Sequence, residues 1–386
     1  MNKNVFKSGK NLLIAALIVI LGGFMFSSCR KKASKSTRET HYPSFYFWRS
    51  VLKFYQNDRI LADSLGVKHF YLRLLDLDYN AAIGAVEQKA SLSANSPDDL
   101  LKFELTPVVY ITNAVFLNLN PMDIGRLAEN VAENVESHLD NFAYHFMNTQ
   151  NIEIQNDSSY NLAKKQWKSR IKEIQIDCDW TQKTKDNYFA FLLRLKKLLA
   201  DKRISVTIRL WQYKYRSKAG IPPVDRGMLM CYNVADPRNN QTENAIADFN
   251  SISQYIEEGG YPLELDVALP LFSWGSIFRT DKFVGLVGNS DPVTLSNKYP
   301  NSFEGKPNSN KLRLKEDMVL GRFYLREGDE VRFQRASKED IDQTITLLKK
   351  HIDMKQSQIA FFDWNEYQIN YYGEKQIKQW LKKAVE

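Results

Sequence analysis

The sequence predicts one (β/α)8 barrel over about residues 43–386, with an insertion after strand 7 at about residues 288–335. Three observations support this fold class. Short apolar segments recur along the chain, amphipathic segments separate them, and the length suits a barrel of this kind. An open doubly wound sheet is the alternative, but the chain has no glycine-rich phosphate-binding turn.

The predicted strands are near-continuous apolar runs, which indicates burial on both faces, as in a parallel sheet covered by helices. There are eight such runs. In chain order they cover residues 44–50, 69–79, 105–113, 174–180, 204–211, 226–233, 263–274 and 358–366.

Apolar residues at three- and four-residue spacing predict helices between the strands. One stripe runs from Ile124 to Phe146, and another runs from Tyr188 to Leu199 with Thr184 as a candidate N-cap. A further helix is expected within residues 147–172, and a final one from about Gly373. We interpret these stripes as helix faces packed on the sheet, and not as ligand sites.

Residues 288–335 do not fit a plain alternation of strands and helices. They begin as a polar loop and continue as the hairpin-like segment MVLGRFYLREGDEVRFQRA. The segment is therefore interpreted as the insertion after strand 7.

The N-terminus has the pattern of a secretion signal. Three lysines precede an apolar run of 15 residues from Leu12 to Phe26, which is short for a membrane span of roughly 20 residues. The run ends in two serines before Cys29, which resembles the cleavage site of bacterial lipoproteins. The resemblance implies a signal peptide at residues 1–28 and a lipidated Cys29 that begins a basic tether at residues 29–42; an uncleaved anchor is the alternative.

The basic excess of the chain lies at this end. The formal net charge is +8, yet residues 1–39 hold eight of the 53 basic and only one of the 45 acidic residues, so the rest has a net charge of +1. A basic tether is attracted to anionic lipid headgroups, whereas a near-neutral body gives little support for nucleic-acid binding. We expect the membrane as a partner, no nucleic acid, and a lipid-anchored position in the cell envelope that faces the periplasm.

Cysteine and histidine usage gives no sign of a metal site or cofactor. Only Cys178 and Cys231 follow Cys29, so no disulfide framework is predicted, and the five histidines are scattered. Asp76 and Asp78 alone are too few oxygen ligands for a cation. We therefore expect neither a metal nor a cofactor.

Polar and aromatic residues fall at the predicted C-terminal ends of the strands, where such a barrel carries its chemistry. Flat rings can cover the apolar faces of pyranoses, and polar side chains can pair with hydroxyls, so this composition suits a carbohydrate. Period-two spacing points Asp177 and Asp179 to the same side of their strand, and these two are the candidate catalytic residues. The candidate substrate-binding residues are Trp48, Asp76, Asn113, Trp180, Arg209, Trp211, Tyr232, Asn233, Trp274, Asp363 and Trp364.

Four segments in the right order resemble glycoside hydrolase family 18, the chitinase-like TIM barrels. The family carries DxxDxDxE on strand 4 and M-x-Y-D on strand 6, and residues 230–233 of this chain read MCYN. "VALPLFSWG" at residues 267–275 is similar to the family's strand 7, and Trp364 is placed like the strand 8 tryptophan that floors a sugar subsite. The strand 4 positions are occupied here by Ile174, Asp177, Asp179 and Thr181.

The chain is also similar to uncharacterised secreted barrels and lipoproteins of Bacteroidetes-type bacteria, which share a strand like QIDxDxT. In the chitinase-like family the last glutamate of the strand 4 motif protonates the leaving group, and the substrate's acetamide attacks. Thr181 occupies that glutamate's position here, and Asn233 replaces an aspartate that holds the acetamide. A threonine hydroxyl is no general acid near neutral pH, and general acid catalysis contributes about 10²–10⁴-fold. The resemblance therefore implies glycan binding without the family's acid catalysis.

Three alternatives remain open. The barrel could be an active glycosidase that uses relocated carboxylates, which must lie roughly 5–5.5 Å apart for retention or 6.5–9.5 Å for inversion. It could be a structural or assembly lipoprotein with a large exposed apolar patch. The two acids could also merely pair with Arg209 in a buried polar layer. The carboxylates considered as relocated partners are Asp76, Asp266, Asp363 and Glu366.

Overall fold

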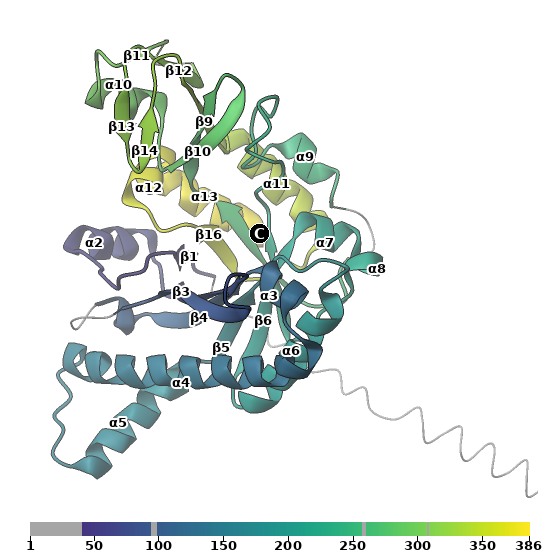
Figure 1. The fold of residues 1–386 in the computed structure, drawn as a ribbon. Helices are drawn as coiled ribbons and strands as arrows, with labels where there is room; N and C mark the ends of the chain where they lie inside the picture. The colour runs from purple at the N-terminus through teal and green to yellow at the C-terminus, as the bar shows by residue number, and fades with distance from the viewer. Residues whose placement is uncertain (1–40, 94–98, 257–259, 307–308) are drawn as a thin grey trace, which may run out of the picture. The chain divides into compact units, whose positions relative to one another are not determined.

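Eight parallel strands close into a barrel with helices around it (Figure 1). The computed structural model describes residues 41–93, 99–256, 260–306 and 309–386. The predicted signal peptide, Cys29 and nearly all of the predicted tether lie outside the described residues. In the part of the chain that the structure describes, no helix is both long enough and apolar enough to cross a bilayer.

The barrel strands follow one another around the ring in chain order, and the register of β1 shows the closure. Ser44 pairs with His69 of β2 on one side and with Ala360 of β16 on the other. The predicted (β/α)8 TIM barrel is therefore confirmed. The eight strands are β1 (Ser44–Phe47), β2 (His69–Asn80), β4 (Glu104–Ile111), β5 (Glu173–Asp177), β6 (Arg203–Arg209), β7 (Arg226–Met230), β8 (Leu265–Pro270) and β16 (Ile359–Phe362).

The helices carry their apolar stripes toward the barrel. Every residue of the stripe predicted in α4 is buried, and each large apolar side chain so buried contributes about 1.5–3 kcal/mol. The described helices are α2 (Gln56–Leu65), α3 (Asn113–Asn118), α4 (Ile124–Thr149), α5 (Asp157–Arg170), α6 (Lys185–Leu198), α7 (Leu210–Lys214), α8 (Arg216–Ala219), α9 (Phe249–Ser253), α10 (Pro292–Lys298), α11 (Lys338–His351), α12 (Glu366–Tyr372) and α13 (Glu374–Val385).

Local signals at the helix ends agree with these bounds. Ser337 caps α11 in a reciprocal arrangement with Asp340, in which each side chain bonds the other's backbone N–H. The helix α2 ends at Leu65 and is capped by Gly66, whose φ of 73° lies in the left-handed region that glycine tolerates best. In α6 the predicted stripe is buried except at its end, where Leu198 is 38% exposed.

Two additions depart from a plain barrel. The strand β2 extends beyond the ring and pairs with the antiparallel β3 (Ala85–Ser91), a hairpin that the sequence pattern did not reveal. Between β8 and α11 the chain builds a second, antiparallel sheet in the order β10-β9-β15-β12-β11, which has its own apolar core. Its strands are β9 (Ser273–Arg279), β10 (Lys282–Gly288), β11 (Phe303–Glu304), β12 (Lys311–Leu314) and β15 (Glu330–Arg335), beside the hairpin β13 (Met318–Leu320) and β14 (Phe323–Leu325).

The second sheet alters one predicted strand. The seventh strand was expected to run to residue 274, but β8 ends at Pro270, and the chain then leaves the barrel for the second sheet. Trp274 consequently belongs to β9 and to the second sheet, whose first strand begins before residue 288.

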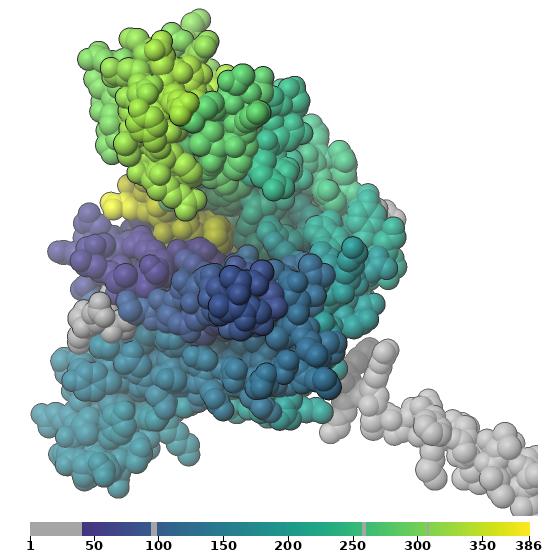
Figure 2. All heavy atoms as spheres, viewed as in Figure 1, coloured from purple at the N-terminus to yellow at the C-terminus, as the bar shows by residue number. Residues whose placement is uncertain are grey.

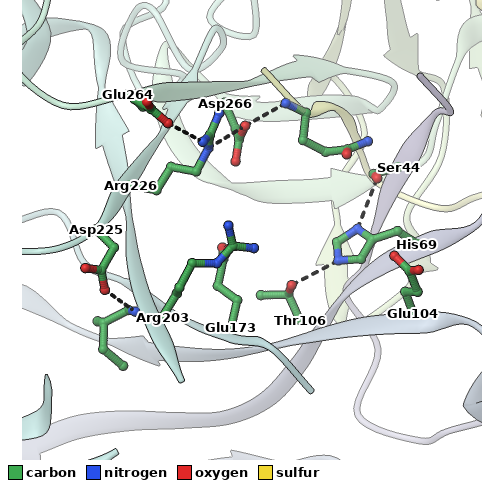
Figure 3. A network of polar contacts seen from close by, with 12 residues as sticks. Ser44, His69, Glu104, Thr106, Glu173, Arg203, Asp225, Arg226, Glu264 and Asp266 are labelled. Carbon is green, nitrogen blue, oxygen red and sulfur yellow. Dashed lines mark hydrogen bonds and ion pairs between the residues drawn. The ribbon is translucent and has the colours of Figure 1, made fainter. Parts of the chain in front are cut away.

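The N-terminal end of the barrel is closed by a buried network of polar side chains (Figure 3). The ring of His69 lies between the hydroxyls of Ser44 and Thr106, at 3.0 and 2.9 Å. Arg226 lies 2.9 Å from the Asp266 carboxylate, which also accepts a bond from the backbone N–H of Gln358 at 2.6 Å. Asp266 is therefore held at the end opposite the mouth and cannot act as a relocated catalytic acid there.

Candidate functional site

A pocket of about 440 Å³ opens at the C-terminal ends of β5, β6 and β7. Several of its lining residues are those expected from the strand-end pattern, and they come from three consecutive strands and the loops after them. The pocket is lined by Asp179, Thr181, Arg209, Leu210, Trp211, Tyr232, Asn233, Val234 and Tyr255. The ends of β5 and β7 thus bring together Asp179, Thr181, Tyr232 and Asn233, which belong to the two motifs of the sequence analysis.

Asp179 and Arg209 form the charged pair of this pocket. Arg209 donates from Nε to Asp179 Oδ1 at 2.5 Å and from Nη2 to Oδ2 at 2.8 Å, which is the two-pronged geometry of strong guanidinium–carboxylate pairs. The Asp179 side chain is still 43% exposed and the Arg209 side chain 22% exposed. The pair is tied together as the third alternative proposed, but it is not sealed inside the barrel.

Asp177 points into the barrel below that pair. Its carboxylate accepts a hydrogen bond of 2.6 Å from the Thr207 hydroxyl. Burial, reinforced by the neighbouring charge of Asp179, raises the pKa of Asp177 from 3.8 to about 6. Asp177 is thus a carboxyl group that holds a proton far more readily than an exposed aspartate does.

Thr181 and Asn113 are both hydrogen-bonded to the side chain of Thr184, which the sequence predicted as the N-cap of the following helix. The Thr184 hydroxyl accepts from the backbone N–H of Thr181 at 2.9 Å and donates to Asn113 Oδ1 at 2.6 Å. Thr184 stands at the N-cap of α6, as predicted, yet its hydroxyl makes no capping bond. Its hydroxyl instead links the segment after β5 to the start of α3.

Tyr232 and Asn233 follow β7 and complete the wall of the pocket on that side. The Tyr232 hydroxyl is buried with no hydrogen-bond partner among the described atoms, and burial raises its pKa well above the ordinary value. Asn233 is exposed and has a φ of 57°, a left-handed conformation that asparagine tolerates better than most residues. An amide here can donate and accept hydrogen bonds, but it cannot take a charge.

The burial of two tryptophans contradicts their assignment as substrate-binding residues. Trp180 is 0% exposed, stacks on Tyr188 at 5.2 Å and donates from Nε1 to the Ala219 carbonyl at 3.0 Å. Trp364 is 1% exposed and donates to Asp58 at 2.7 Å. Neither indole presents a face to solvent, so neither can be a sugar platform; both complete the packing between strands and helices.

The remaining candidates lie around the mouth and outside the pocket. Trp48 and Trp274 are half-buried, and Trp274 donates from Nε1 to Gln334 Oε1 at 2.6 Å. Asp76 is held by Arg73, whose Nε donates to it at 2.8 Å. Burial raises the pKa of Asp363 to about 6, although the charge of Arg49 acts in the opposite direction. Glu366 is exposed and lines a separate hollow beside α2.

Sequence reasoning missed several residues of this end of the barrel. Thr207 and Thr184 orient predicted residues, and Tyr255 supplies part of the pocket wall. Tyr110 and Phe362 are half-buried at the ends of β4 and β16. Tyr110 and Phe362 could have been predicted at the mouth, because they lie near the ends of predicted strands. Tyr255 follows α9 in a long connection, and no sequence pattern indicated its place in the pocket.

A larger cleft, of about 780 Å³, lies on the outside of the barrel between α4, α5 and α6. Two of its lysines pair with an acid beside the cleft, since Lys168 donates to Asp140 at 2.8 Å and Lys164 donates to it at 2.6 Å. Charges that satisfy each other at a surface need no ligand. Within the described residues no group of three or more His, Cys, Asp or Glu side chains is arranged to hold a metal ion.

Comparison with known proteins gives likenesses of fold. No protein-family model and no curated protein matches the chain. The spore cortex-lytic enzyme SleL of Bacillus cereus is 13% identical with a TM-score of 0.42, over 90% of this chain and 75% of that one. A chitinase domain from Pyrococcus furiosus, in complex with chito-oligosaccharides, is 11% identical with a TM-score of 0.34, over 88% and 95% of the two chains.

A xylanase and α-amylase inhibitor protein from Scadoxus multiflorus is also similar, at 9% identity and a TM-score of 0.37, over 90% of this chain and 98% of that one. These neighbours include a chitinase, the class of barrel that the sequence motifs resemble.

Proposed function

We propose that the barrel binds a carbohydrate in the pocket at the ends of β5, β6 and β7, without the acid catalysis of the chitinase-like family. The observation that carries the proposal is the lining of this pocket. It combines the Asp179–Arg209 pair and the Asn233 amide with the half-buried rings of Trp211 and Tyr255. Polar groups that donate and accept, set beside flat apolar faces, are what a pyranose requires.

The same lining supports the absence of the family's catalysis. Thr181 lines the pocket where the resemblance places the acid, and its backbone N–H is tied to Thr184. Asp179, which the family uses to hold the acetamide, is occupied by two hydrogen bonds from Arg209. A threonine hydroxyl is no general acid near neutral pH, and the Asp179 oxygens that Arg209 already engages are less available to orient an acetamide.

Hydrolysis by other carboxylates is the second candidate, and one observation favours it. Asp177 and Asp363 both have pKa values raised to about 6, which suits a general acid near neutral pH. This activity would show as glycan cleavage whose rate falls as the pH rises through about 6, and Asp177→Asn would abolish it. Cleavage with that profile would replace the binding proposal.

A glycan array combined with thermal unfolding tests the proposal, using the chain from residue 40 onward, the compact unit without the predicted anchor. A ligand at 100 times its Kd stabilises the folded state by about 2.7 kcal/mol, which raises the Tm measurably. We expect at least one glycan to raise the Tm of the wild type and not that of Asp179→Ala. Asp201→Ala, which removes an acid that is 74% exposed on a remote loop, is the matched control and should respond as the wild type does.

Two results would overturn the proposal. One is the absence of any array signal together with no shift in Tm for soluble glycans at millimolar concentration. The other is an equal response of Asp179→Ala and the wild type, since the pocket would then not be the binding site. The lipid anchor at Cys29, the periplasm-facing position and the role of an assembly lipoprotein stay predictions.

A further inference from the structure

The main-chain pairing of β5 and β6 ends before either strand reaches the pocket. Ile176 and Val206 are the last partners in the ladder between the two strands. Beyond them the strand ends are joined by side chains, as where Thr207 donates to Asp177 at 2.6 Å. These ends face the mouth of the barrel, and Figure 2 shows the surface hollowed between the green atoms of the second sheet and the blue and teal atoms of the barrel. The geometry of the pocket therefore depends on side-chain contacts past the end of the ladder.

Gln212 makes one such contact, and it uses both ends of its amide. Its Oε1 accepts a hydrogen bond from the backbone N–H of Arg209 at 2.7 Å, and its Nε2 donates to the backbone carbonyl of Trp180 at 2.8 Å. The donor and the acceptor on the backbone fix which end of the amide is oxygen and which is nitrogen. Gln212 is 0% exposed, so both bonds are shielded from water. One buried side chain thus bridges the end of β6 and the segment after β5.

The two backbone groups that Gln212 binds lie next to the two halves of the charged pair. Arg209 itself carries the guanidinium, and Trp180 directly follows Asp179, which carries the carboxylate. Trp180 is also fixed from its other side, because its buried indole donates to the Ala219 carbonyl at 3.0 Å. A two-pronged guanidinium–carboxylate pair requires two parallel hydrogen bonds, so it is sensitive to the spacing of the two backbones that carry it.

Helix capping accounts for only half of this arrangement. Gln212 is the third residue of α7, and a glutamine at that position commonly accepts from the backbone N–H of the capping residue, here Arg209. Capping does not require the second bond, which reaches across to Trp180 beyond the neighbouring strand. A buried Nε2 without an acceptor is unfavourable, so this bond also keeps the side chain of Gln212 in place.

We propose that Gln212 is a positioning residue of the pocket, which sets the spacing between the backbones at Asp179 and Arg209 and so holds their side chains in the two-pronged arrangement. The inference rests on the proposed function where it concerns the glycan. It adds a residue that acts through others, since Gln212 is buried and is not among the residues that line the pocket. The pair presents its polar surface in a fixed geometry only while the bridge is intact, so loss of the bridge should weaken binding without removing any contact group.

Gln212→Met tests the proposal, because methionine keeps the length of the side chain and loses both hydrogen bonds. The first measurement needs no ligand. It follows hydrogen exchange at the guanidinium Nε–H of Arg209 by ¹⁵N NMR, with Arg209→Lys to assign the signal. In the wild type this proton is donated to Asp179 over an Nε–Oδ1 distance of 2.5 Å. Because two hydrogen bonds that hold the pair are lost, we expect its exchange to be about tenfold faster in Gln212→Met.

An equivalent pair in the second sheet provides the control within the same spectrum. Arg279 donates from Nε and Nη2 to the Asp329 carboxylate at 2.9 and 2.7 Å, which is the same two-pronged geometry. A general loss of stability would speed exchange at both arginines, whereas a local one would speed it at Arg209 alone, and we expect the local result. Should Gln212→Met fold poorly, Gln212→Glu keeps the acceptor and loses the donor to Trp180, and it should give the same contrast.

The second measurement is the affinity for a glycan identified by the array, which should fall about tenfold in Gln212→Met. Ser357→Ala removes a buried hydroxyl that donates to the Leu265 carbonyl at 2.6 Å at the closed end of the barrel, and as the control for lost stability it should bind as the wild type does.

The outcomes separate the two proposals. Exchange at Arg209 that stays at the wild-type rate in the Gln212 variants would overturn the positioning role, whatever the glycan affinities are. Faster exchange with wild-type affinity would also overturn it, since the pair would then loosen without consequence for the pocket. If no glycan binds the wild type, the proposed function fails, and the exchange contrast between Arg209 and Arg279 alone decides whether Gln212 holds the pair.

Discussion

The two ends of the barrel use the same kinds of side chain in opposite ways. At the N-terminal end Arg226 and Asp266 are paired, and their side chains are only 10% and 4% exposed (Figure 3). At the C-terminal end the pair Asp179–Arg209 has similar bonding distances, but its carboxylate is 43% exposed and faces a pocket. The first pair is enclosed and serves stability, whereas the second leaves polar surface for a ligand, as expected of the two faces of such a barrel.

The largest effect is expected at the closed end. Arg226→Leu leaves the buried carboxylate of Asp266 without its cation, and breaking a buried pair in this way costs about 3–5 kcal/mol. Urea unfolding should show this loss. Arg203→Ala removes an arginine that is 53% exposed and lies 3.2 Å from Glu173, and it should cost about 1 kcal/mol or less. Equal losses in the two variants would contradict the view that enclosure is what makes this end important.

A pH-dependent effect is expected at the open end. Asp177 has a pKa raised from 3.8 to about 6 in the folded protein, so the folded state binds the proton more tightly than the unfolded chain does. Stability is therefore highest below about pH 4 as far as this group is concerned, and it falls as the pH rises toward and past 6. At 1.36 kcal/mol per pKa unit the loss amounts to about 3 kcal/mol.

Asp177→Asn removes that titration. The unfolding free energy of the variant, relative to the wild type, should rise by up to about 3 kcal/mol between pH 4 and pH 7. The measurement is urea unfolding over this range, and Asp186→Asn, whose side chain is 92% exposed, serves as the control with no expected slope. A flat difference between Asp177→Asn and the wild type would show that Asp177 is not buried as a proton holder.

The smallest effect sharpens the distinction between core and mouth tryptophans. Trp364→Phe keeps most of the packing but leaves Asp58 without its indole donor, which costs about 1–3 kcal/mol for a buried acceptor. Thermal unfolding should show the loss, whereas glycan binding should be unchanged. Altered binding with unchanged Tm would instead place Trp364 in the proposed carbohydrate site.

The barrel itself was predictable because burial on both faces leaves an apolar run for each strand, and all eight runs became strands of one ring. The assignment of Trp180 to the sugar site was wrong, although the alternation of the strand carried a signal for its burial. Period-two alternation that points Asp177 and Asp179 inward must point the residue between or after them to the other side, and Trp180 indeed packs against Tyr188 of α6. For Trp364 no such signal was available, since its burial depends on Asp58 of the distant α2.

The second sheet was only partly predictable. Its hairpin-like end is visible in the sequence, but the first strand, β9, directly follows β8 and reads as a continuation of the same apolar run. The pairing of β9 with both β10 and β15 decides that Trp274 leaves the barrel. Such pairings join segments far apart in the chain, so local pattern does not reveal them.

The sequence by itself determined the ring of strands, the covering helices and the presence of a hydroxyl at Thr181, because periodicity and residue identity are local properties. Only the tertiary structure decided that Asp179 is paired with Arg209 yet open to a pocket, and that two of the expected tryptophans are core. These depend on which side chains meet and which remain exposed, and that is settled by the closure of the barrel and not by any stretch of the chain alone.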